Sequence, residues 1–394
     1  TRIPEALHLG EVYRSKPSEQ AELFNDHFFE QFSGVSNYDI QVDTRTDDTF
    51  DIDFNYVKIE ILLSSINVNK AMGPDMISGK VLKNCAKSLS IPISILFYNF
   101  YHSSKLPKDL KMANVVPVHK KGSKSDVENY RPISLTSLVS KILEQIIRDE
   151  LMLRCNIHID QRQHGFMQGK SCGTQLVGFC DSIALSLNEN IRSDIVYFDF
   201  AKAFDSVRHD IILDKLKHQF HIDGLLLGFI VDYLKDRSQS VVLGNASSSS
   251  KPVTSGVPQG SILGPTLFVL FLNDITNGIS ENTNILMYAD DTKIWRKINE
   301  ESDHFILQKD IDFLNDWALK NSMKFHPSKC KALMVSKAKM PLVNILPFVQ
   351  FHYSLGQELI DYCDSEKDLG IHMNGSLNFT EHSDILYSKA NQRF

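Results

Sequence analysis

Three aspartates stand where two apolar segments of the chain end. Asp199 directly follows the run 195–198, and Asp290 and Asp291 follow a second run that ends at Tyr288. Short runs rich in β-branched and aromatic residues predict buried strands. If the two strands are neighbours in one sheet, three carboxylates come within reach of one point. Such a cluster repels itself, and two Mg²⁺ ions relieve the repulsion in sites that transfer phosphoryl groups in line.

The elements around the aspartates predict how they are positioned. Strands are expected at 194–198, 284–288 and 332–335, and helices at 266–275 and 306–320. The first of these helices is opened by a Gly-Pro pair, and proline is well tolerated at a first helical position. This alternation predicts a split βαβ sheet. The alternative for an isolated Asp-Asp pair is a polar turn without chemistry.

The front of the chain predicts mainly helices. An apolar helical stripe follows Pro17, and further helical patterns occupy 59–66, 81–101 and 138–153. A short strand is expected at 115–118, with Lys120 and Lys121 at its end. The chain as a whole is therefore expected to be α+β.

Composition limits the class of protein without naming a function. The formal net charge of the 394 residues is −6, and acidic residues concentrate before residue 60. No stretch approaches the 18 to 20 apolar residues that a membrane span needs, so we expect a soluble, intracellular protein with no membrane partner. The six cysteines are scattered, without disulfide or zinc spacing, and predict buried free thiols. The oligomeric state is not specified.

Six short segments follow one another along the chain. They are Asn129-Tyr130-Arg131-Pro132-Ile133-Ser134-Leu135, Asp199-Phe200-Ala201-Lys202-Ala203-Phe204-Asp205, Gly256-Val257-Pro258-Gln259-Gly260-Ser261-Ile262-Leu263-Gly264-Pro265, Tyr288-Ala289-Asp290-Asp291, Pro327-Ser328-Lys329-Cys330 and Asp368-Leu369-Gly370-Ile371. In this order they resemble the reverse transcriptase of non-LTR (LINE-type, jockey-like) retrotransposons, and their agreement in order is far more specific than any one of them. The resemblance covers roughly residues 60 to 385 of the chain.

The resemblance implies a right-hand polymerase fold with helical and β-hairpin fingers and a ferredoxin-like palm. We expect an N-terminal helix and acidic linker over 1–58, fingers over 59–190, and a palm over 191–380. The reverse transcriptase domain as a whole is expected at about 99–374. Residues 381–394 would begin a thumb that is largely missing, and the chain is expected to be a fragment of a longer polypeptide.

The implied function is RNA-directed DNA synthesis. The chain is expected to copy retrotransposon RNA into cDNA by two-metal-ion nucleotidyl transfer, with template RNA, a DNA primer or target DNA, and dNTPs as partners. In the full-length protein, synthesis is expected to be primed at the chromosomal target. The protein would then occur in a cytoplasmic ribonucleoprotein and in the nucleus.

The resemblance also assigns catalytic residues. Asp199 and Asp290 would bind two Mg²⁺ ions, for which Mn²⁺ is a possible substitute, with Asp291 close by and the carbonyl of Phe200 completing a metal shell. Lys329 would protonate the pyrophosphate leaving group. An ordinary surface lysine is the alternative for Lys329.

Four further residues are assigned to the incoming nucleotide. Lys120 and Arg131 would bind the triphosphate, a role that suits a point charge and a guanidinium fork. Gln259 would contact the nucleotide or template from a glycine-rich turn, and Phe204 would lie beneath the sugar and exclude a 2′-hydroxyl. The alternatives are a solvated pair on a hairpin for the two cations, a turn-stabilising amide for Gln259 and core packing for Phe204.

The template track is assigned to the segment Gln163-His164-Gly165-Phe166, with Gly165 and Tyr288 as contacts. This segment departs from the family because Met167-Gln168 replaces the usual basic residue, and Lys170 is expected to compensate.

Two rival functions remain open. One is another two-metal enzyme, a nuclease or an RNA-templated RNA polymerase. Phe204 argues against the latter, which needs a small or polar residue five positions after Asp199. The other is a non-catalytic RNA-binding relic, against which the intact Asp199, Asp290 and Asp291 argue.

Overall fold

The computed structural model describes residues 3–32, 52–337 and 351–392. The chain forms two compact units, which we call unit 1 (Thr1–Ile159 and Phe204–Phe271) and unit 2 (Asp160–Ala203 and Leu272–Phe394). The chain therefore passes between the units three times, a division that the predicted linear boundaries did not contain. Within the described residues, none of the helices combines the length and apolar character that crossing a membrane demands.

The sheet of unit 1 has the strand order β4-β3-β6-β7. In it, β3 (Met112–His119) pairs antiparallel with β4 (Tyr130–Leu135) and parallel with β6 (Ser238–Leu243). Two short strands, β7 (Ala246–Ser247) and β8 (Lys251–Pro252), pair with β6. The predicted strand at 115–118 is thus part of a longer hairpin.

The N-terminal helix belongs to the core of unit 1. The predicted helix is present as α1 (Pro17–Phe29), preceded by the hairpin of β1 (Leu7–Leu9) and β2 (Val12–Arg14). Phe24 is fully buried, and its ring meets that of Tyr130 on β4 with centroids 5.0 Å apart. The helix therefore buries its apolar face on the sheet of unit 1. The acidic linker predicted after it lies mostly outside the described residues.

Helices make up the rest of unit 1. The predicted continuous helical region 81–101 is interrupted at Cys85, whose backbone (φ −102°, ψ 14°) ends one helix and precedes the next. The helices are α2 (Tyr56–Ser64), α3 (Gly79–Asn84), α4 (Ala86–His102), α5 (Leu138–Cys155), α7 (His209–His218), α8 (Gly224–Leu234) and α9 (Leu263–Leu272), the last of which ends in unit 2.

The sheet of unit 2 has the strand order β14-β11-β5-β10-β9. Its strands are β5 (Arg192–Phe198), β9 (Thr283–Tyr288), β10 (Asp291–Ile298), β11 (Lys331–Val335) and β14 (Asp361–Tyr362). The central strand β5 is antiparallel to both β10 and β11, and β9 and β10 form a hairpin. This is the order of the predicted split βαβ sheet, with β14 added at the edge.

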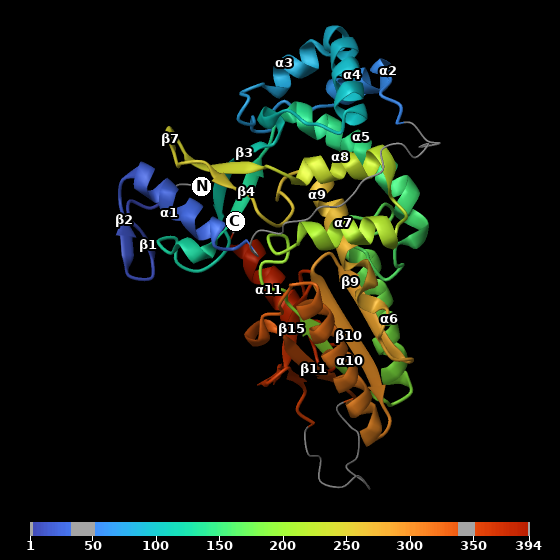
Figure 1. Cartoon of the computed structure of the whole chain (residues 1–394). Helices are drawn as coiled ribbons and strands as arrows, with labels where there is room; N and C mark the ends of the chain where they lie inside the picture. Colours follow the sequence, from blue (N-terminus) through green and yellow to red (C-terminus); the bar gives the residue numbers. More distant parts are fainter. Residues whose placement is uncertain (1–2, 33–51, 338–350, 393–394) are drawn as a thin grey trace. The chain divides into compact units, whose positions relative to one another are not determined.

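Both faces of the central strand are covered. Helix α6 (Cys172–Asn188) packs Phe179 against Ile195 and Trp295 on one face of the sheet. Helix α10 (Glu301–Lys320) lies along β10 (Figure 1). The remaining elements of unit 2 are β12 (Ser354–Leu355), β13 (Glu358–Leu359), β15 (Ser365–Asp368), β16 (Ile371–Asn374) and α11 (Thr380–Asn391). None of the described side chains of α11 is buried, and its assignment to a thumb stays a prediction.

Candidate active site

The register of the unit 2 sheet brings the three predicted aspartates to one end. Phe198 of β5 lies opposite Thr292 of β10, so Asp199 leaves β5 beside Asp291. Tyr288 pairs with Asp291 across the β9–β10 hairpin, and Ala289 and Asp290 form the turn between them. Ala289 has φ 56°, the left-handed conformation that such a tight turn requires. We call Asp199, Asp290 and Asp291 the carboxylate cluster.

Desolvation and charge repulsion both act on the carboxylate cluster. Desolvation by the surrounding chain, followed by the charges of Asp290 and Asp199, raises the pKa of Asp291 to about 6, although its side chain is exposed. Lys293 has a smaller opposing effect on this pKa. Like charges at close range favour the protonated form unless a cation is present.

The donor set of the cluster fits a hard divalent cation, because all three ligands are carboxylates and Mg²⁺ prefers oxygen. The residues described do not, however, include a group of three or more His, Cys, Asp or Glu side chains already arranged around a metal position. Mg²⁺ typically keeps several water ligands and uses substrate phosphates, so a protein cage complete in itself is not required.

The segment after β5 is held by the backbone of residues 324–326. His326 N donates to the carbonyl of Asp199 at 2.8 Å, and the ring of Phe200 stacks on Phe325 with centroids 4.2 Å apart. Lys329 follows in the same segment, and its Nζ lies 3.6 Å from Oδ2 of Asp199. The structure therefore brings Phe200 and Lys329 to the cluster, while their assigned roles stay predictions.

A buried amide holds the turn of the cluster. Oε1 of Gln163 accepts hydrogen bonds from Ala289 N at 3.0 Å and from Gly165 N at 2.7 Å. A Cβ on Gly165 would lie only 2.2 Å from Ala289 N, so only glycine fits here without a backbone shift. Sequence reasoning placed this segment on a template track and assigned no role to Gln163. A glutamine side chain can accept hydrogen bonds from the unpaired N–H groups of a turn. A glutamine close to a glycine was therefore the signal that the sequence offered.

The other predicted template residues lie close to the same segment. Lys170 Nζ donates to the carbonyl of Gln163 at 3.0 Å and also to that of Gln161, and burial lowers its pKa. Tyr288 is half-buried, and its contact with Cys172 raises its pKa. Lys170 is thus tied to the loop that carries Gly165.

The predicted triphosphate residues lie in unit 1, on the β3–β4 hairpin. Arg131 lies opposite Val118 in the hairpin register, and Lys120 follows β3, where its N–H donates to the carbonyl of Asn129 at 2.8 Å. Both residues are exposed. The fold therefore presents two cations on one hairpin.

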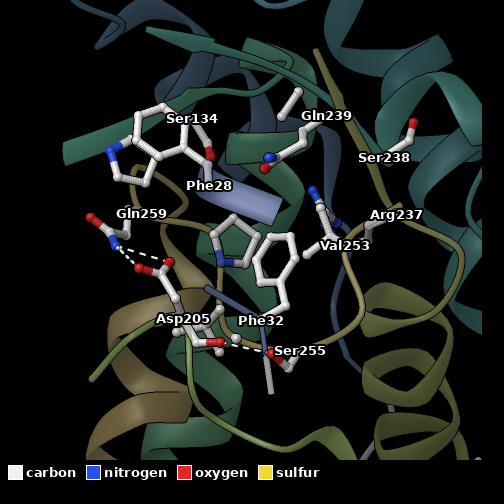
Figure 2. A pocket seen from close by; sticks show the side chains of 15 residues that line it. Phe28, Phe32, Ser134, Asp205, Arg237, Ser238, Gln239, Val253, Ser255 and Gln259 are labelled. Atoms are coloured by element: carbon white, nitrogen blue, oxygen red, sulfur yellow. Dashed lines mark hydrogen bonds between the residues drawn. The ribbon is translucent and has the colours of Figure 1, made fainter. Parts of the chain in front are cut away.

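Phe204 and Gln259 lie on two loops of unit 1 that are joined by hydrogen bonds. Val257 N donates to the carbonyl of Phe204 at 2.9 Å, and the ring of Phe204 stacks on Phe268 with centroids 4.3 Å apart. Nε2 of Gln259 donates to both carboxylate oxygens of Asp205, at 2.9 and 3.0 Å (Figure 2). Asp205 was not among the predicted site residues.

Gln259 and Asp205 border a small cavity in unit 1, with a volume of about 30 Å³. Phe28 of α1, Pro132 of β4 and the buried Arg237 also line it (Figure 2). The glycine after Gln259 has φ 123°, and a Cβ there would lie 2.4 Å from the carbonyl oxygen of Ser134. The turn expected from the sequence approaches β4 so closely that it requires a glycine at this position.

The chain is similar to known proteins over most of its length. Residues 118–372 match the family model described as reverse transcriptase (RNA-dependent DNA polymerase). The chain is 28% identical over 336 residues to the RNA-directed DNA polymerase from mobile element jockey of Drosophila melanogaster, with 82% of this chain and 36% of that protein covered. The jockey polymerase of Drosophila funebris is 26% identical, with 92% and 41% covered.

Other similarities extend the comparison. The probable RNA-directed DNA polymerase from transposon BS of Drosophila melanogaster is 27% identical, with 100% of this chain and 44% of that protein covered. The chain thus spans less than half the length of these three relatives. A solved structure of apo telomerase from Candida tropicalis, truncated from the C-terminal domain, aligns over 74% of this chain and 60% of that chain, with 11% identity and a TM-score of 0.47.

Proposed function

The chain belongs to the reverse transcriptase (RNA-dependent DNA polymerase) family, and we propose that it synthesises DNA on an RNA template by two-metal-ion nucleotidyl transfer. The observation that carries the proposal is the carboxylate cluster, because the register of β5, β10 and β9 places Asp199, Asp290 and Asp291 at one end of one sheet. All three residues lie within the matched region.

In the proposed reaction, the 3′-hydroxyl of the primer attacks the α-phosphorus of a dNTP and pyrophosphate leaves. Asp199 and Asp290 would hold two Mg²⁺ ions, or Mn²⁺ in their place, with Asp291 nearby and the carbonyl of Phe200 as a further ligand. When bound, the ions activate the attacking hydroxyl and stabilise the charge on the transferred phosphate. The raised pKa of Asp291 supports this, because burial and the charges of Asp290 and Asp199 disfavour its ionised form, which a bound divalent cation would favour.

Other residues of the chain would act on the nucleotide. We assign the triphosphate to Lys120 and Arg131, whose exposure on one hairpin leaves them accessible. Gln259 would contact the nucleotide or the template, and Phe204 would lie beneath the sugar of the nucleotide. Lys329 would donate a proton to the leaving pyrophosphate, and its Nζ lies 3.6 Å from a carboxylate oxygen of Asp199, at the cluster where that leaving group would form.

The RNA template would follow the segment of Gly165 and Lys170 and reach Tyr288. The support is the direct packing of this segment against the turn of the carboxylate cluster. In the full-length protein, we propose that the template is retrotransposon RNA and that synthesis starts from nicked target DNA. A cytoplasmic ribonucleoprotein and the nucleus are the compartments that this proposal implies.

Primer extension tests the proposal. The protein is incubated with poly(rA)/oligo(dT), Mg²⁺ and either dTTP or UTP, and the Asp290→Asn variant is the matched control. Extension with dTTP that the variant lacks supports the proposal. Extension with UTP alone identifies an RNA polymerase, and primer shortening identifies a nuclease. Binding of the hybrid without any extension identifies a non-catalytic relic.

A further inference from the structure

Asp205 and Gln259 form a pair that fixes two loops of unit 1 relative to each other. Asp205 comes from the loop after β5, and Gln259 from the loop before α9. Besides the contact between their side chains, Ser255 Oγ donates to the backbone carbonyl of Asp205 at 2.8 Å. The backbone of Gln259 is fixed as well, because its carbonyl accepts from Ser134 N at 2.7 Å. The amide therefore has a defined location before any ligand arrives.

The chemistry of the pair also fixes which way the amide faces. A carboxylate only accepts hydrogen bonds, whereas the glutamine amide has an NH₂ group that donates and an oxygen that accepts. If the amide oxygen faced Asp205, two hydrogen-bond acceptors would lie against each other. The NH₂ group therefore faces Asp205, and Oε1 faces away. Within the described part of the chain, Gln259 Oε1 receives no hydrogen bond, and the residue is half-exposed. Oε1 is thus an oriented acceptor that is open to a ligand.

We propose that Asp205 is a positioning residue that holds Gln259 as a fixed acceptor for a sugar hydroxyl of the incoming nucleotide. This inference rests on the proposed function and adds a residue to it. The four dNTPs differ in the donors of their bases, and the 3′-hydroxyl is the donor that all four share. An acceptor with one fixed direction therefore suits a polymerase that must accept every base.

Removal of the carboxylate should release the amide without removing it. In an Asp205→Ala variant, the Gln259 side chain gains rotamers and both amide orientations, and ordering it again on binding opposes the hydrogen bond. An Asp205→Asn variant keeps the shape, but its own amide can donate as well as accept, so one orientation is no longer selected. Asp205→Glu keeps an acceptor-only group.

The test measures kcat/KM on poly(rA)/oligo(dT) for dTTP and for 2′,3′-dideoxy-TTP, which lacks the 3′-hydroxyl of dTTP. We expect Asp205→Ala to lower the ratio of the two values about tenfold, the size of one net hydrogen bond. Gln259→Ala should lower it equally, and the double variant no further, because both residues act through one contact. Asp205→Glu should retain more of the ratio than Asp205→Asn. An unchanged ratio in Asp205→Ala, or effects that multiply in the double variant, would overturn the proposal.

Ser255→Ala is the matched control for a merely structural role. It removes the side-chain bond to the backbone of Asp205 and leaves the Asp205 carboxylate and the Gln259 amide in place. We expect a lower Tm with an unchanged ratio. If Ser255→Ala lowers the ratio as far as Asp205→Ala does, loop integrity and not amide orientation sets the selectivity, and the proposal fails.

A binding measurement separates this proposal from the proposed function. Dissociation constants of dTTP and dideoxy-TTP are measured on a complex whose primer ends in a dideoxynucleotide, so that no turnover is needed. Selective binding that Asp205→Ala abolishes supports the positioning role even if ordinary primers are not extended, in which case only the proposed function fails. Equal binding of both nucleotides by the unaltered protein overturns the positioning role.

Discussion

The carboxylate cluster of unit 2 differs from the cavity of unit 1 that Gln259 and Asp205 border, here called the glutamine pocket, in how acidic side chains are held. In the cluster, three aspartates are brought together by strand register, and the pKa of Asp291 rises to about 6. In the pocket, the single carboxylate of Asp205 receives two hydrogen-bond contacts from the amide of Gln259. In the proposed function the first region is completed by a cation, whereas the second is ordered by hydrogen bonds within the chain.

This difference indicates where each region obtains its specificity. The cluster offers charge without a fixed cage, so in the proposed reaction its selectivity for substrate would depend on the metal ions and phosphates that it binds. The pocket offers an oriented acceptor and a turn in close contact with β4, and Phe204, the residue before Asp205, stacks on Phe268. We therefore expect variants of the cluster to change rate, and variants of the pocket to change the choice of nucleotide.

The largest effect is expected at Asp290. Asp290→Asn removes a metal ligand without a change in size, so primer extension should fall by about a thousandfold or more while the fold and RNA binding survive. Single-turnover extension, a melting curve and a filter-binding assay measure the three properties. Extension at the rate of the unaltered protein in Mg²⁺ would show that the cluster is not catalytic.

The second-largest loss of activity is expected at Gly165, whose backbone lies against the turn of the carboxylate cluster. A Cβ at Gly165 would lie 2.2 Å from Ala289 N, so Gly165→Ala must displace one of the two backbones. A displacement of about 1 Å at a catalytic group can cost on the order of a hundredfold in rate. We expect this loss in kcat, with destabilisation of about 1–3 kcal/mol.

Gly178→Ala is the control for Gly165→Ala. Gly178 lies in α6, and a Cβ there would meet nothing within 4 Å. This variant should keep full activity and gain about 0.5–1 kcal/mol in stability, since alanine is the better helix former. Equal activity of the two variants would show that the position of the turn does not limit the reaction.

Sugar selectivity tests the role assigned to Phe204, the residue before Asp205. If its ring excludes a 2′-hydroxyl, Phe204→Val lowers the ratio of dNTP to rNTP incorporation at least about tenfold, or 1.4 kcal/mol, with a modest loss of dNTP rate. The stacking on Phe268 allows a second outcome, in which the ring serves packing alone. A lower Tm with unchanged sugar selectivity would establish that outcome. Values of kcat/KM for both nucleotides and a melting curve distinguish the two outcomes.

The smallest effect is expected from the pH dependence of the cluster. The folded-state pKa of Asp291 lies above its ordinary value of 3.8, so between these values the folded state binds a proton that the unfolded state does not. Stability from this group therefore increases as the pH falls from 7 to 5. Without divalent cations, Asp291→Asn should raise Tm at pH 7 by about 1–2 °C, a small gain because the side chain is exposed.

Three measurements check this expectation for Asp291. At pH 5 the gain should vanish, since the unaltered protein is then largely neutral at this position. Asp316→Asn, on the exposed face of α10, should leave Tm unchanged at either pH. Added Mg²⁺ should raise the Tm of the unaltered protein more than that of Asp291→Asn. The same gain at both pH values would contradict the repulsion inferred for the cluster.

Much of the fold could be predicted from local patterns. The strands at 194–198 and 284–288 and the helix ending at Lys320 are found close to their predicted positions, because apolar periodicity reports which face of an element is buried. Family membership confirms the predicted α+β right-hand polymerase class. The break at Cys85 was missed, since a continuous apolar pattern gives no signal where one helix ends and the next begins.

The residue types of the candidate site and their order along the chain could be predicted from the sequence. Asp199, Asp290 and Asp291 were identifiable because each follows an apolar strand pattern and stands in a segment that resembles the family. The residues that hold the site in place became known only from the folded chain: Gln163 is 126 positions from Ala289, and Asp205 is 54 positions from Gln259. Hydrogen bonds between distant loops leave no periodic trace in a sequence, because each depends on where folding places two backbones rather than on the pattern within one element.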